Sequence, residues 1–147
     1  MYGDTAAGRK RVAQLREQGG DIRALAARLV SQAEAVPWHG KAADAMRERI
    51  KERASHLRTA AAHHETAADS LARHLVEVDT LKEAIDVRAH KATTLVEDAR
   101  TRAGEASGPD GIPAEADEAD EADAALLAFD PPPAGHKDWL TVNLPGL

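Results

Sequence analysis

The sequence lacks cysteine and has few aromatic residues. Its 147 residues include two Trp, one Tyr and one Phe, which together make up 3% of the chain. Without thiols the chain can form neither a disulfide nor a thiolate metal site. Alanine supplies much of the 43% hydrophobic content, and alanine favours helix but buries little area. The core is therefore thin for a chain of one domain's length, which favours an elongated helical assembly over a globule.

Long apolar runs are also missing. No stretch approaches the roughly 20 apolar residues that a membrane-spanning helix needs, so we expect no stable membrane insertion. The basic residues near the start, Arg9-Lys10-Arg11, are not followed by an apolar core. We therefore expect no cleaved secretory signal peptide.

No part of the chain has a strong excess of positive charge. Residues 1–102 carry 18 basic and 15 acidic residues, whereas residues 103–147 carry one basic and ten acidic residues. Interleaved charges of both signs are typical of solvated helix faces, so we expect no nucleic-acid partner. The acidity belongs to the C-terminal part.

Residue patterns that carry chemistry are absent as well. The seven histidines include no pair at i,i+4 spacing, and no serine stands in a nucleophile-elbow context. We therefore predict no catalytic residues, no cofactor, no metal and no enzyme activity. His64 is singled out because it occupies an apolar heptad position, where a buried imidazole would need a hydrogen-bond partner and could make packing depend on pH.

Helical periodicity begins early. Residues 5–18 are predicted to form a short amphipathic helix that Gly19-Gly20 interrupts, so that residues 1–20 make a separate short helix or arm. Asp21 is the predicted N-cap of a second helix, and Pro37 ends it. The apolar residues of this second helix recur every three or four positions: Ile22, Leu25, Leu29, Ala33 and Val36.

Beyond Gly40 the chain has no Pro or Gly until Gly104. A heptad pattern over this stretch predicts a long helix packed lengthwise on others, and residues 21–103 are assigned to one helical domain. The spacing slips at Val78–Leu81, which predicts a bend or reversal there. The far half of the helix must then fold back as a three-helix bundle or be covered by another chain. The residues expected in the packing seam or partner interface are Met46, Ile50, Leu57, Leu71 and Leu75.

Residues 104–147 differ in composition from the rest of the chain. Glycine, proline and repeated Glu-Ala-Asp units predict a disordered acidic tail, with a transient helix at 124–129. Residues 136–147 are apolar again, and the alternation of three of them is typical of a short strand. We consider this stretch either a docking motif or an unstructured end. The residues that would dock are Trp139, Leu140, Val142 and Leu144.

One motif suggests a family. Trp38-His39-Gly40 lies between two helical stripes and is followed by Lys-Ala-Ala-Asp-Ala-Met-Arg. It resembles the WXG (Trp-x-Gly) family, and in particular the alanine- and arginine-rich modules of actinobacterial type VII secretion. The resemblance covers roughly residues 20–100. It implies an antiparallel helical hairpin with Trp38 and Gly40 in the turn, Trp38 packing on both helices and Gly40 permitting a tight backbone.

The resemblance also implies a function. It predicts a type VII secretion substrate or export partner that acts by helix–helix packing, as a homodimer or as a heterodimer with another WXG-like hairpin. The protein would be secreted without a cleaved signal and would contact a component of the secretion machinery. The family's Tyr-x-x-x-Asp/Glu signal is missing, since Tyr2 has Ala6 four places on. Export would then use a partner's signal or the tail that contains Trp139.

The predicted fold is thus all-α, a long antiparallel helical hairpin or three-helix bundle with a disordered acidic tail. A second function remains open. The chain could instead be a cytoplasmic coiled-coil scaffold or adaptor with an acidic docking tail.

Overall fold

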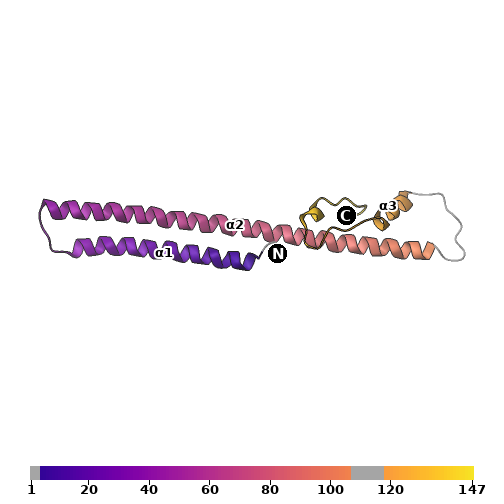
Figure 1. Ribbon diagram of the computed structural model, residues 1–147, viewed down its shortest axis with the longest axis horizontal. Coiled ribbons are helices and arrows are strands. Elements are labelled where there is room, and N and C mark those ends of the chain that lie inside the picture. The colour runs from indigo at the N-terminus through magenta and orange to yellow at the C-terminus, as the bar shows by residue number, and fades with distance from the viewer. Residues whose placement is uncertain (1–3, 107–117) are drawn as a thin grey trace. The chain divides into compact units, whose positions relative to one another are not determined.

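The computed structural model describes residues 4–106 and 118–147 (Figure 1). Within these ranges the elements are all helical, in the order α1 (Thr5–Ala35), α2 (Lys41–Ala106), α3 (Glu118–Leu127) and the 3-10 helix η1 (Lys137–Leu140). The predicted all-α class is confirmed. None of the helices in the described ranges is long and apolar enough to cross a membrane.

Helix α1 begins at a capped N-terminus and runs without a break. The side chain of Asp4 accepts hydrogen bonds from the backbone N–H groups of Ala6 at 3.1 Å and Ala7 at 3.3 Å. The interruption expected at Gly19-Gly20 is absent, so residues 5–20 are the first half of α1 and not a separate arm. Gly19 is buried, and a Cβ added there would lie 3.3 Å from the carbonyl oxygen of Ala61. This glycine therefore permits close approach of two helices.

Helix α2 is a single helix of 66 residues, more than twice the 31 residues of α1. The reversal expected near Val78–Leu81 does not occur. Leu81 is 50% exposed, and the heptad column of the partly buried Val78 continues by steps of seven to the buried residues Ile85, Ala92 and Ala99. The heptad spacing therefore passes Leu81 without a slip, although the buried column changes from that of Leu75 to that of Ile85.

The chain divides into two compact units, Met1–Asp79 and Thr80–Leu147. In the first unit α1 lies beside α2 and runs antiparallel to it (Figure 1). Three ion pairs follow this direction, since the residue numbers rise on α1 as they fall on α2. They are Arg9–Asp79, Arg16–Asp69 and Arg23–Glu65. Val12, Ala68 and Leu75 form the buried cluster between the two helices.

In the second unit the C-terminal part of the chain packs on α2. Trp139 is only 4% exposed and forms a cluster with Ile85 and Ala92. The expected disordered tail is thus wrong for residues 118–147, while residues 107–117 lie outside the described part of the chain. The strand expected around Leu140–Leu144 is also wrong, because η1 ends at Leu140 and residues 141–144 form no strand.

Candidate interaction surface

The connection between α1 and α2 is held by an arginine. Gly40 has a φ of +102°, which an L-residue with a side chain rarely adopts. The Nη2 atom of Arg47 donates hydrogen bonds to the backbone carbonyls of Val36 at 2.9 Å and Trp38 at 2.7 Å. The side chain of Arg47 thereby binds two carbonyls that follow the end of α1, and the carbonyl of Val36 also accepts a hydrogen bond from the backbone N–H of Trp38 at 2.9 Å.

Trp38 itself does not pack as expected. It is 56% exposed, so it does not anchor the first turns of both helices. Sequence reasoning placed this role on the aromatic residue and missed Arg47. The available signal was the heptad position of Arg47, seven residues before Ala54, where a charged residue interrupts an otherwise apolar column.

Two columns of mostly small residues make the contact between α1 and α2. On each helix they recur every seven residues, and the alanines at four of these positions have no exposed surface. Small side chains let two helix backbones approach closely, and they gain little area each in doing so. We call these the small-residue columns; they are Val12, Gly19, Ala26 and Ala33 on α1, and Ala54, Ala61, Ala68 and Leu75 on α2.

Beside each small-residue column runs a column of larger side chains that are only partly buried. Each position of it lies three residues after a small-residue position, except Ile50, which follows Arg47 at the same heptad position; this spacing places the column on the adjoining edge of the same helix face. We call these the aliphatic columns; they are Leu15, Ile22 and Leu29 on α1 with Val36 directly after its end, and Ile50, Leu57, Leu71 and Val78 on α2.

The ion pairs show which side of the helix pair is closed. Arg23 and Glu65 each lie four residues after a small-residue position, and their side chains meet through hydrogen bonds of 2.9 and 2.6 Å. They therefore close the side next to the small-residue columns. The hydrogen bonds from Arg23 lower the pKa of Glu65 below its ordinary value.

The aliphatic columns border the opposite side, because reversing one helix of an antiparallel pair keeps equivalent heptad positions on the same side. Two apolar residues flank the columns there and are strongly exposed: Leu25 at 44% and Met46 at 40%. Leu25 lies one residue before the small-residue position Ala26, and Met46 lies one residue before Arg47, which precedes Ala54 by seven residues. We call the aliphatic columns together with Leu25 and Met46 the open face.

The predicted seam residues divide between these groups. Leu75 is in the buried contact between α1 and α2. Ile50, Leu57 and Leu71 are in the aliphatic column and only partly buried. Met46 was expected in the seam but is exposed beside it, because it lies one position off the heptad columns.

His64 occupies the heptad position between Leu57 and Leu71. It is partly buried, and its Nδ1 atom lies 3.0 Å from the carbonyl oxygen of Ala60 on the preceding turn. The hydrogen-bond partner expected for this imidazole is thus a carbonyl of its own helix.

A second candidate surface lies in the C-terminal unit, where Arg88 of α2 forms hydrogen bonds with main-chain carbonyls of Trp139 and Val142. Its Nε donates to the carbonyl of Trp139 at 2.9 Å, and its Nη2 donates to the carbonyl of Val142 at 2.5 Å. The indole N–H of Trp139 donates to the carbonyl of Pro133 at 3.1 Å. The ring of Phe129 meets the indole edge-on, with ring centroids 6.0 Å apart.

The predicted docking residues are therefore engaged within the chain. Val142 and Leu144 pack against the cluster of Ile85, Ala92 and Trp139, while Leu140 is 37% exposed. Helix α3 is tied to α2 by the pair Arg102–Asp123, whose hydrogen bonds of 2.8 and 2.6 Å lower the pKa of Asp123.

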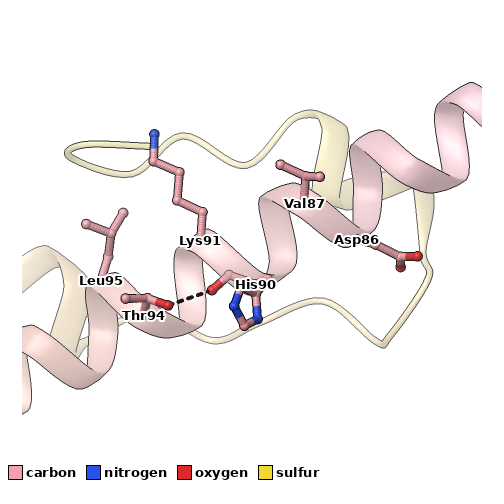
Figure 2. Close-up of a pocket in the computed structure, with 6 residues that line it drawn as sticks. All are labelled: Asp86, Val87, His90, Lys91, Thr94 and Leu95. Carbon is pink, nitrogen blue, oxygen red and sulfur yellow. Dashed lines mark hydrogen bonds between the residues drawn. The ribbon is translucent and has the colours of Figure 1, made fainter.

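An open groove of about 650 Å³ runs along the same part of α2. Figure 2 shows its lining residues on two sides of one helix, with Val87, Lys91 and Leu95 on one side and Asp86, His90 and Thr94 on the other. The labelled polar groups diverge, so the groove brings together no acid, base and nucleophile. In the described residues no group of three or more His, Asp or Glu side chains is placed to hold a metal ion.

Comparison of the chain with protein-family models, with curated proteins and with solved structures finds no match. The two surfaces described above are therefore the features of the molecule that bear on its function.

Proposed function

We propose that this protein is a non-catalytic helix-pairing module, and that it serves as a substrate or export partner in a type VII secretion system. Its open face would pack against the helical hairpin of a second WXG-like chain, identical or related. The observation that carries the pairing is the partial exposure of the aliphatic columns on both helices, flanked by the exposed Leu25 and Met46.

Burial energies support this assignment. Full burial of a Leu or Ile side chain stabilises a protein by roughly 1.5–3 kcal/mol. The side chains of both aliphatic columns are only partly buried in the single chain, so they provide only part of this stabilisation. A second pair of helices would cover them in a four-helix arrangement, the usual way for antiparallel helix pairs to complete a core. The link to secretion is supported by the Trp38-His39-Gly40 motif with Gly40 at positive φ.

Pairing is tested by charged substitutions at exposed positions, which should leave the fold of one chain intact. Leu25→Glu and Met46→Glu place carboxylates on the open face. Val76→Glu is the matched control, because Val76 is 65% exposed and follows the small-residue position Leu75, on the side closed by the ion pairs. Light scattering coupled to gel filtration should show pairing in the parent and the control, and a lower mass or at least a tenfold weaker association in the two face variants.

The mass measurement depends on which chains are present, because the proposed partner is either a second copy or a related hairpin protein. The same measurement is therefore made with the parent alone and with candidate hairpin proteins co-expressed. Equal masses for Leu25→Glu, Met46→Glu and Val76→Glu under all conditions would show that the open face takes no part in pairing.

Export is tested separately. A tagged chain should reach the culture supernatant only where the secretion ATPase is intact, and Leu25→Glu should reduce that amount if pairing precedes export. Retention in the cytosol with every candidate partner would instead favour the coiled-coil scaffold.

A further inference from the structure

The end of the chain is attached to α2 as a short continuous peptide. We call residues 129–147 the Trp139 segment. It is anchored by the buried indole of Trp139, by the two main-chain carbonyls that Arg88 binds, and by contacts near the terminus. A Cβ added at Gly146 would lie 3.4 Å from the Cδ2 atom of Leu95. All three anchors fall on one stretch of α2, between Ile85 and Leu95.

These anchors are separable from the fold of α2. The Trp139 segment contains one four-residue 3-10 helix and forms no strand, so no ladder of backbone hydrogen bonds joins it to the rest of the protein. The backbone of α2 is satisfied by its own helical hydrogen bonds. Elements held by few contacts of this kind open at lower free-energy cost than the helices they cover.

We propose that the α2 surface formed by Ile85, Arg88, Ala92 and Leu95 is a peptide-binding site whose occupant in trans is the Trp139 segment of a second copy of this chain. In the single chain the site is closed by the chain's own segment. The same contacts form whichever copy supplies the segment, and this equivalence is what makes exchange between copies a low-cost route to association.

The chemistry of the contacts defines the ligand. The site takes a tryptophan ring against Ile85 and Ala92, and the guanidinium of Arg88 binds carbonyls three residues apart. Trp139 lies in the 3-10 helix Lys137–Leu140 and Val142 follows its C-cap Thr141, and this folded path brings both carbonyls to one side chain. A fully extended peptide would separate them by about 10 Å, so the site selects a Trp-containing turn over a straight strand.

At low protein concentration, binding of the Trp139 segment to the site of its own chain dominates over binding to a second copy. A segment tethered to its own site has an effective concentration in the millimolar range, so a free peptide at micromolar concentration should bind the parent poorly. Removing the tryptophan anchor from the full-length chain should open the site to a ligand added in trans.

The test uses full-length Trp139→Ala and a fluorescent synthetic peptide of residues 129–147. Fluorescence anisotropy should show saturable binding that is at least about tenfold tighter than binding to the parent. Trp38→Ala is the matched control: it removes the chain's other, exposed tryptophan and should bind the peptide as poorly as the parent does. Adding Arg88→Ala to Trp139→Ala should weaken binding at least about tenfold, and a peptide with alanine in place of Trp139 should not compete.

A second measurement does not depend on the Trp139→Ala chain remaining folded. Because the sequence has no cysteine, Leu95→Cys and Leu147→Cys introduce unique thiols. When the two single variants are mixed, a short bis-maleimide should join the different chains, with a yield well above that of Leu95→Cys mixed with His39→Cys. Equal yields in these two mixtures, or equal peptide binding to the parent and Trp139→Ala, would overturn the proposal, as would equally tight binding of an unrelated apolar peptide.

Discussion

Two adjacent glycines of α1 provide a sharp test of how closely this helix packs on α2. Gly19 faces the contact, where an added Cβ would lie 3.3 Å from the carbonyl oxygen of Ala61 and 3.4 Å from the Cγ atom of Glu65. At Gly20 an added Cβ would meet nothing within 4 Å. The two positions share the same helix and nearly the same local sequence, so they differ chiefly in what their side chains would touch.

The expected magnitudes follow from these distances. Replacing a helical glycine by alanine stabilises a protein by about 0.5–1 kcal/mol where space allows, so Gly20→Ala should show this full gain. Gly19→Ala should gain less, because a backbone carbonyl has to shift by a few tenths of an ångström. Leucine enlarges the contrast: Gly19→Leu should destabilise by about 1–3 kcal/mol through overpacking, whereas Gly20→Leu should still stabilise by a few tenths of a kcal/mol.

The assay is urea unfolding followed by circular dichroism at a fixed protein concentration, with the midpoints compared at constant slope. The order of stability should be Gly20→Ala, Gly20→Leu, parent and Gly19→Leu, with Gly19→Ala below Gly20→Ala. Should Gly19→Leu and Gly20→Leu have the same midpoint, α1 and α2 would not be in close contact at this level, and the small-residue columns would not be the core of the pair.

Other substitutions have separate expectations. Trp139→Ala should lower the free energy of unfolding by about 3 kcal/mol because the indole is buried, and Trp38→Ala by less than about 0.5 kcal/mol because the residue is exposed; thermal melts that show equal losses would contradict this contrast. Arg47→Lys keeps the positive charge but loses the pair of hydrogen bonds to two carbonyls, and should lower the free energy of unfolding by about 1 kcal/mol in urea titrations. Arg23 lowers the pKa of Glu65, so the benefit of this pair is complete above the ordinary carboxyl pKa and is lost as the pH falls through the lowered value. The stability difference between the parent and Glu65→Gln should therefore shrink below about pH 4, and a difference that persists at pH 2 would contradict the assignment to this ion pair.

The helices could be predicted because their signals are local. Pro37 and Gly40 mark the connection, and the heptad recurrence of apolar residues defines the faces of α2. Leu75, one residue of this recurrence, lies in the buried cluster with Val12 and Ala68. Gly19-Gly20 misled the prediction, because a glycine pair signals a break in an isolated helix, whereas here Gly19 is required by a neighbouring helix that no local pattern reveals.

The second half of α2 shows the same limit more strongly. Its cover is supplied by Trp139, whose carbonyl is bound by Arg88 at a separation of 51 residues. The acidic and proline-rich sequence between them predicted disorder, and it carries no sign of where the chain returns. Neither expected solution, a reversal near residue 80 or a second chain, is the one the structure shows for Ile85 and Ala92. What the sequence did contain was a cluster of apolar residues around Trp139, too hydrophobic for a purely solvated tail.

The distribution of large and small side chains bears on what this fold is for. A helix pair that had only to hold itself together would gain most by placing leucine and isoleucine in the contact, since each buries far more area than alanine. Here the fully buried positions are alanines such as Ala26 and Ala61, while Ile22 and Leu57 stand at the edge and remain partly exposed. The alanines let the two helices approach closely, and the antiparallel arrangement places both aliphatic columns on the same side of the pair. Much of the hydrophobic gain available to residues such as Ile22 and Leu57 is therefore unrealised in the single chain, and an apolar surface that covered the open face would add it.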